Sequence, residues 1–201
     1  MTNPLIYLAS QSSRRRELLL QIGLAHELIS VEIDETPHPG EGSELYVTRM
    51  ALEKARAGRA TLSVVDRPVL GADTSVVIDG ELLGKPCDEE EARRMLQRLA
   101  GRTHLVLSGV ALVDAENEES RLSVSHVTFR EISDQEGCDY WQSGEPIDKA
   151  GGYGIQGLGA VFIERLEGSY SGVMGLPLFE TAALARDFGI QLPISGVISD
   201  K

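Results

Sequence analysis

Hydroxyl and arginine side chains gather directly after the first apolar segment of the chain. Residues 5–9 have the pattern of a strand, and they are followed by Ser10-Gln11-Ser12-Ser13-Arg14-Arg15-Arg16 at the beginning of a leucine-rich stretch. The N-terminus of a helix exposes unpaired N–H groups and a partial positive charge, so hydroxyls and arginines placed there suit a phosphate group. Segment 10–16 therefore predicts an anion-binding site.

Asp73 is an ionisable residue inside the otherwise apolar segment Val69–Ile78. A carboxylate is costly to bury unless a cation or a metal ion lies beside it. The alternative is an aspartate whose hydrogen bonds are satisfied at the end of a strand. Because buried ionisable groups often mark active sites, we favour a catalytic role. The small residues Gly71 and Ala72 would let a ligand approach closely.

Acidic residues also occur where a predicted strand gives way to a loop, at Asp34 and Glu35. Two carboxylates from separate elements could hold one Mg²⁺, which takes oxygen ligands and keeps waters and substrate phosphates in its shell. The sequence leaves open which of the two acids would face the metal. A solvated loop acid is the alternative, since such residues are commonly exposed.

Three lysines stand in informative contexts. Lysine usually extends into solvent, so position alone says little. However, Lys54 borders the apolar stripe of a predicted helix, Lys85 lies in a Gly-Lys-Pro string near the strand partner of the Asp73 segment, and Lys149 opens a glycine-rich segment. These contexts favour a role in binding an anionic ligand.

Several common nucleotide and hydrolase motifs are absent from the sequence. It contains neither a P-loop string nor Gly-x-Ser-x-Gly. Segment 152–157 fits Gly-x-Gly-x-x-Gly, but a strand does not directly precede it and a long helix is not expected after it. A dinucleotide-binding fold and a hydrolase triad are therefore disfavoured.

Composition limits the classes of partner. With 31 acidic against 19 basic residues the formal net charge is −12, so the average field repels nucleic acid and a polyanion needs a local cationic pocket. Cys87 and Cys138 are far apart and lack histidines at metal spacing, which argues against zinc or a disulfide framework. The sequence shows neither a leader nor a long apolar run, so we expect a cytoplasmic protein that does not contact a membrane.

The pattern of elements predicts an α/β fold with a mixed sheet, in one domain over residues 1–201. Segment 145–157 is expected to be a shaped loop without regular structure. The expected helices are 13–22, 43–60, 88–99, 133–143 and 177–188. The expected strands are 5–9, 26–33, 69–78, 81–85, 103–114, 121–132, 160–166 and 170–173, with a turn at 116–119.

Several unusual strings, in order over nearly the whole chain, resemble the Maf family of nucleoside triphosphate pyrophosphatases. They are Leu8-Ala9-Ser10-Gln11-Ser12-Ser13-Arg14-Arg15, Asp34-Glu35, Glu53-Lys54-Ala55, Gly71-Ala72-Asp73-Thr74, Gly84-Lys85-Pro86, Asp148-Lys149-Ala150-Gly151-Gly152-Tyr153-Gly154-Ile155-Gln156-Gly157 and Gly175-Leu176-Pro177. One departure is Ser13, where the family often has proline. Both residues suit the start of a helix, so the turn should change little.

The resemblance implies a mixed central β-sheet flanked by helices, with two lobes around a central cleft, and a homodimer. It also implies hydrolysis of a nucleoside triphosphate between the α and β phosphates, with a divalent metal cation, Mg²⁺ or Mn²⁺. In the family, the residue matching Asp73 accepts the proton of the attacking water, and Glu35 with Asp73 would hold the metal. The substrate contacts implied by the match are Ser10, Arg15, Lys54, Lys85 and Lys149.

The resemblance also narrows the substrate. The subgroup that acts on dTTP and UTP is similar to this chain at Arg14, Thr74 and Gln156, which are linked to the choice of base. An arginine and an amide can match the donors and acceptors on the edge of thymine or uracil. Two alternatives stay open: a nucleotide-binding regulator of cell division and septum formation without significant turnover, and a pyrophosphatase for 7-methyl-GTP or inosine nucleotides.

Overall fold

The computed structural model describes residues 5–64 and 66–193, and the chain folds as two compact units. The first unit comprises Met1–Asp73, Ser108–Ser123 and Gly175–Lys201, and the second comprises Thr74–Leu107 and Val124–Met174. The single domain expected over 1–201 stays a prediction, and its residues 1–4, 65 and 194–201 lie outside the described part.

The described strands form a seven-stranded sheet. Its pairing is mixed, as the sequence predicted, although eight strands were expected. The order of the described strands is β2-β1-β3-β5-β6-β7, with β4 paired to β3. The pairing is parallel for β1 with β2 and β3, and antiparallel for β3 with β4 and β6 with β7. The bounds are β1 Ile6–Leu8, β2 His26–Leu28, β3 Val69–Ile78, β4 Glu81–Leu83, β5 Thr103–Val113, β6 Glu118–Phe129 and β7 Ile163–Glu167.

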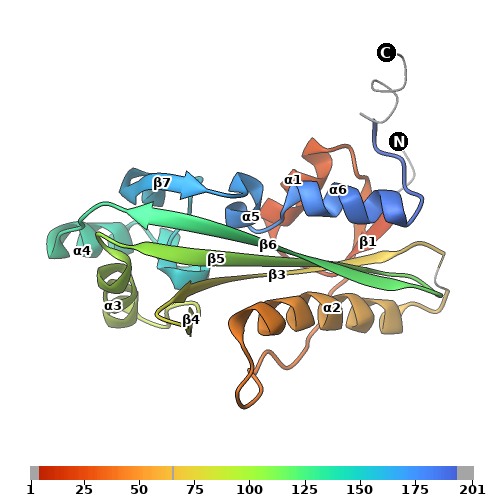
Figure 1. Cartoon of the computed structure of the whole chain (residues 1–201), viewed down its shortest axis with the longest axis horizontal. Coiled ribbons are helices and arrows are strands. Elements are labelled where there is room, and N and C mark those ends of the chain that lie inside the picture. Colours follow the sequence, from red (N-terminus) through yellow and green to blue (C-terminus); the bar gives the residue numbers. More distant parts are fainter. Residues whose placement is uncertain (1–4, 65, 194–201) are drawn as a thin grey trace. The chain divides into compact units, whose positions relative to one another are not determined.

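In the first unit, helix α2 (Ser43–Thr61) lies on one face of the sheet, and α1 (Ser13–Gln21) and α6 (Leu178–Asp187) lie on the other (Figure 1). Helix α2 buries its predicted apolar stripe, which is Val47, Met50, Ala51 and Ala55. These residues recur at the three- and four-residue spacing of one helix face, so they pack on the sheet while the opposite face stays exposed.

The second unit has its own apolar core around the C-terminal half of β3. Helix α3 (Glu89–Leu99) begins at the N-cap Asp88, whose carboxylate accepts a hydrogen bond from Glu91 N, and buries Leu96 and Leu99. Helix α4 (Asp134–Gln142) is capped by the Ser133–Glu136 capping box. Among the helices that the structure describes, none is long and apolar enough to cross a membrane.

Two predictions after residue 157 are wrong. The segment 170–173 is not a strand but helix α5, Tyr170–Met174, because Ser169 starts a turn: its Oγ accepts from Gly172 N and its carbonyl from Val173 N, each at 3.0 Å. The predicted strand 160–166 starts only at Ile163, since the residues before it form the 3₁₀ helix Leu158–Phe162.

Other segments also differ from the prediction. Segment 145–157, expected to lack regular structure, contains the 3₁₀ helices Glu145–Asp148 and Ala150–Gly152. Strand β2 is shorter than 26–33, because its partner β1 is itself only three residues long. Strand β6 begins at Glu118, inside the expected turn 116–119. Glu118 and Glu119 therefore belong to the strand rather than to the turn.

Candidate functional site

The hydroxyl- and arginine-rich segment 10–16 forms the predicted turn into α1. Ser12 is the N-cap, and its Oγ accepts from Arg15 N at 3.5 Å, while Ser10 Oγ accepts from Ser12 N at 3.2 Å. The side chain of Arg15 folds back over this turn and donates from Nη1 to Ser10 Oγ at 3.2 Å. The structure therefore joins the hydroxyl of Ser10 and the guanidinium of Arg15, while Arg16 is exposed.

Arg15 is also tied to the segment that precedes α6. Its Nε donates to the carbonyl of Gly175 at 2.8 Å. Gly175 has a φ of 125°, a backbone conformation that favours glycine. The orientation of its carbonyl therefore depends on glycine at this position. The pKa of the Arg15 guanidinium is lowered, mainly because burial removes its hydration. The negative charges of Asp73 and Glu35 oppose this shift, and the positive charge of Arg14 adds to it.

Lys54 joins the two carboxylates that the sequence singled out. Its Nζ lies 2.7 Å from Asp73 Oδ1 and 2.8 Å from Glu35 Oε1. The side chains of Lys54 and Asp73 are 14% and 12% exposed, whereas that of Glu35 is 57% exposed. Asp34, the alternative to Glu35, instead accepts from Thr36 N at 2.9 Å and shapes its own turn.

Glycine at position 71 of β3 allows this strand to approach helix α2 closely. A Cβ at Gly71 would lie 2.2 Å from the carbonyl oxygen of Ala51 and 2.5 Å from the nitrogen of Ala55, both in α2. The backbone of α2 therefore takes the room that the sequence had suggested for a ligand. This close approach places Lys54, between the two alanines in the helix, against Asp73.

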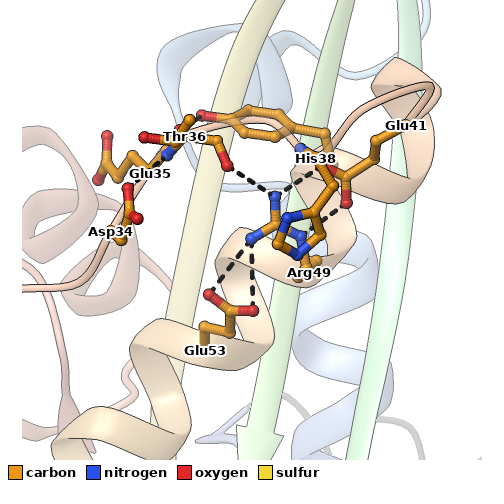
Figure 2. A network of polar contacts seen from close by, with 8 residues as sticks. Asp34, Glu35, Thr36, His38, Glu41, Arg49 and Glu53 are labelled. Atoms are coloured by element: carbon orange, nitrogen blue, oxygen red, sulfur yellow. Dashed lines mark hydrogen bonds and ion pairs between the residues drawn. The ribbon is translucent and has the colours of Figure 1, made fainter.

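The loop that carries Glu35 is held on α2 by Arg49 (Figure 2). The guanidinium donates to both carboxylate oxygens of Glu41 at 2.6 Å, to Glu53 Oε1 at 3.3 Å, and to the carbonyl of Thr36 at 3.2 Å. These hydrogen bonds lower the pKa of Glu41 to about 2. Glu41 in turn accepts from His38 N at 3.0 Å, so both ends of the loop are fixed.

Tyr46 gives the same loop a second attachment. Its hydroxyl donates to the carbonyl of Glu35 at 2.9 Å. Burial, followed by the charges of Asp73 and Glu35, raises the pKa of Tyr46 to about 12, so the hydroxyl stays a donor. Arg49, Glu41 and Tyr46 were not predicted from the sequence. The four-residue spacing of Arg49 and Glu53 was a readable signal, but the contact with Glu41 requires the folded loop.

Glu35 and Asp73 are the two carboxylates here that could hold a divalent cation. In the structure one oxygen of each lies within 2.8 Å of the ammonium group of Lys54. Across residues 5–64 and 66–193, no group of three or more His, Cys, Asp and Glu side chains is placed to hold a metal ion. Two carboxylates nevertheless suffice for Mg²⁺, which completes its shell with water and substrate phosphates.

Of the predicted contacts to the base, Arg14 is partly exposed on α1 in the first unit, and its contact stays a prediction. Four other predicted site residues belong to the second unit. Thr74 directly follows Asp73 in β3, and Lys85 and Gln156 are exposed. Lys149 Nζ donates to the carbonyl of Glu145 at 2.8 Å and to Asp148 Oδ1 at 2.7 Å, so its ammonium group has partners within its own unit. The substrate contacts assigned to these four residues stay predictions.

A family model and several relatives match this chain over most of its length. A family model described as Maf-like protein matches residues 5–188. A dTTP/UTP pyrophosphatase of Alkalilimnicola ehrlichii is 58% identical over 191 residues, covering 93% of this chain and 94% of the relative. Proteins with the same name from Aromatoleum aromaticum and Chromobacterium violaceum are 52% and 51% identical, covering 93% and 94% of this chain and 97% and 96% of the relatives.

Proposed function

Because the chain belongs to the Maf family, we propose that it is a nucleoside triphosphate pyrophosphatase that hydrolyses dTTP and UTP to the monophosphate and pyrophosphate. The observation that carries the proposal is the meeting of Glu35, Lys54 and Asp73 in one unit. Modified pyrimidine nucleotides fall within the same substrate class. We also propose that the protein forms a homodimer, as the family resemblance implies, and that it acts in the cytoplasm.

Asp73 is the proposed proton acceptor. Its carboxylate is nearly buried, and the ammonium group of Lys54 at 2.7 Å fixes Oδ1, so the group is oriented before substrate arrives. A water molecule hydrogen-bonded to this carboxylate would pass its proton to Asp73 as the water oxygen attacks the α-phosphorus. Holding the base and the attacking water in place supplies both general-base and orientation effects.

Cationic groups would neutralise the phosphates. Arg15 uses part of its guanidinium on Ser10 and Gly175, which fixes its plane and leaves further N–H donors for a phosphate. Lys54 is a second proposed phosphate contact in the first unit. Lys85 and Lys149 are the proposed phosphate contacts in the second unit. Donors fixed before the reaction stabilise charge that develops as the P–O bond breaks.

Glu35 and Asp73 are the proposed ligands of the metal, Mg²⁺ or Mn²⁺. When bound, the metal would neutralise charge on the phosphates and the leaving pyrophosphate. Arg14, Thr74 and Gln156 are the proposed contacts to the base. An arginine and an amide offer donors and acceptors that suit the edge of thymine or uracil.

The test is the product formed from each nucleotide. With Mg²⁺ or Mn²⁺, the purified protein should release pyrophosphate from dTTP and UTP faster than from 7-methyl-GTP and ITP. Asp73→Asn should lower kcat by about 10²–10⁴-fold, the usual contribution of a general base. The exposed Asp139 on α4 supplies the matched control, Asp139→Asn, which should leave the rate unchanged.

Three results would overturn the proposal. Release of orthophosphate would exclude cleavage between the α and β phosphates. Full activity in Asp73→Asn would remove the assigned base. Tight nucleotide binding with no turnover of any triphosphate would support a nucleotide-sensing regulator instead.

A further inference from the structure

Glu145 is a partly exposed acidic side chain that accepts hydrogen bonds from its own glycine-rich segment. In the second unit, its Oε2 accepts from Leu158 N at 2.7 Å, and its Oε1 accepts from Gly159 N at 3.0 Å. Oε1 also accepts from the hydroxyl of Tyr140 at 2.7 Å. The pKa of Glu145 is lowered: desolvation opposes the shift, but these hydrogen bonds and Lys149 outweigh it.

The glycines of this segment make room for that carboxylate. A Cβ at Gly157 would lie 2.0 Å from Glu145 Oε2, and one at Gly154 would lie 3.1 Å from Oε1. A Cβ at Gly159 would lie 2.6 Å from the hydroxyl of Tyr140. The glycine spacing that resembles a phosphate-binding loop therefore serves contacts with the protein's own acid and phenol.

The same contacts use the backbone donors that a phosphate would need. Leu158 N and Gly159 N donate to Glu145, and Gly154 N donates to the hydroxyl of Tyr140 at 3.1 Å. In loops that bind phosphate, such N–H groups point at the ligand. Here a carboxylate of the chain takes the place of the anion, and this holds the segment in one shape.

Gln156 lies between the two points at which the segment is held. Gly154 on one side and Leu158 on the other are fixed by Tyr140 and Glu145, while Gln156 itself is exposed. The backbone position of Gln156 therefore depends on the side chains of Tyr140 and Glu145. An amide that reads a base must be placed to within a fraction of an ångström to discriminate.

We propose that Glu145 is a positioning residue that fixes Gln156 and thereby sets selectivity for the pyrimidine base. This inference rests on the proposed function, since it assigns Gln156 to the base of dTTP or UTP. The role differs from catalysis: Glu145 acts through the backbone of 154–159 rather than on the phosphates. Removing it should weaken base recognition and leave the chemical step largely intact.

The test compares Glu145→Gln and Tyr140→Phe with the wild-type chain. In Glu145→Gln an amide NH₂ must face at least one of the donors that the carboxylate now accepts from. We expect kcat/KM for dTTP and UTP to fall by about 10²-fold, mainly through a higher KM. The ratio of kcat/KM for dTTP over GTP should fall by about 10-fold. Tyr140→Phe should change both quantities in the same direction but less.

Glu164→Gln is the matched control, because Glu164 is exposed on β7 in the same unit. It should leave KM and the nucleotide ratio unchanged. If Glu145→Gln lowers kcat alone and keeps the dTTP to GTP ratio, the positioning role is wrong. Equal losses for all nucleotides, with KM unchanged, would also overturn it.

Hydrogen exchange provides a readout that does not depend on the enzyme reaction. In Glu145→Gln, the amides of Leu158 and Gly159 should exchange at least about 10-fold faster, while amides of β5 keep their protection. Unchanged exchange at these two amides would show that Glu145 does not hold the segment. If the wild-type chain hydrolyses neither dTTP nor UTP, the proposed function fails, and the exchange experiment still decides whether Glu145 shapes 154–159.

Discussion

His104 is a buried imidazole that the proposed reaction does not use. It is 2% exposed, its Nε2 lies 2.8 Å from the hydroxyl of Tyr153, and its ring meets Phe129 and Tyr153 edge to face. Within the described residues, its Nδ1 has no hydrogen-bond partner. Burial lowers the pKa of His104 to about 4, so the ring is neutral in the folded chain near neutral pH.

This residue should make stability fall as the solution becomes mildly acidic. The unfolded chain binds the proton with a pKa of about 6.5, so the contribution is complete above that value and is lost as pH decreases toward about 4. Between about pH 7 and about pH 5, the free energy of unfolding should fall by about 2 kcal/mol more in the wild type than in His104→Gln. Urea unfolding at each pH measures the difference.

The exposed His126 on β6 gives the control, His126→Gln, whose pH dependence should match that of the wild type. Absolute stability is not the criterion, because His104→Gln also removes packing against two aromatic rings. If the two histidine variants and the wild type lose stability in parallel over this pH range, His104 is not the titrating group.

At the scale of elements, the loop before α2 is the part whose position matters most to the proposed site. Arg49 and Tyr46 are both on α2, and together they hold the carbonyls of Thr36 and Glu35. A rigid helix thus positions a carboxylate that lies on a loop. Such indirect supports commonly change metal affinity when they are removed.

Arg49→Met should raise the Mg²⁺ concentration needed for half-maximal activity by about 10–100-fold. The substitution keeps the bulk of the side chain but removes the donors to Glu41, Glu53 and Thr36. Arg49→Lys should recover part of the loss. The direct measurement is a Mg²⁺ titration of pyrophosphate release, accompanied by limited proteolysis of the loop in the absence of metal.

Arg94→Met serves as the control for that series, because Arg94 forms an exposed ion pair with Glu90 on α3. It should leave the Mg²⁺ requirement unchanged, as exposed pairs contribute little. An unaltered Mg²⁺ titration in Arg49→Met would exclude a role for Arg49 in placing Glu35.

The elements that the sequence predicted best are those with a clear local period. Strand Val69–Ile78 and the helix beginning at Ser43 have the predicted starts, because apolar periodicity and a long buried stripe are local signals. The segment 170–173 looked like a strand, but a side-chain turn at Ser169 decided its conformation. Such a contact depends on one hydroxyl rather than on a period.

The candidate site also contains residues that the sequence predicted and residues that it did not. Asp73 and Lys54 were predictable because each has an unusual setting in the sequence, whereas the family resemblance singled out Glu35 rather than Asp34. The structure brings Asp73, Lys54 and Glu35 together. Glu41 and Glu145 were not singled out, since an acid in a loop is usually solvated. What makes them special is the set of donors that meet them only after folding.

At the scale of the whole molecule, the net charge of −12 means that contacts between carboxylates and cationic or N–H groups matter for stability. Among the described residues, each unit contains a carboxyl group whose pKa is lowered to about 2. Hydrogen bonds from Arg49 lower the pKa of Glu41 to about 2 in the first unit. In the second, a hydrogen bond from Arg130 and the capping contacts of Ser133 lower the pKa of Glu136 to about 2.

Both units should therefore lose stability in acid. A glutamate in the unfolded chain has a pKa of about 4.3, so each lowered group stabilises the fold above that value, and the contribution is lost as pH falls toward about 2. The thermal midpoint of the wild type should fall more steeply between about pH 5 and about pH 2 than that of the double variant Glu41→Gln, Glu136→Gln. Calorimetry at constant ionic strength measures both slopes, with Glu164→Gln as the control that should follow the wild type. Equal slopes for the wild type and the double variant would mean that other carboxylates govern the acid transition. The two single variants, Glu41→Gln and Glu136→Gln, are measured as well. If only one of them reduces the slope, the effect is confined to the unit that carries that residue.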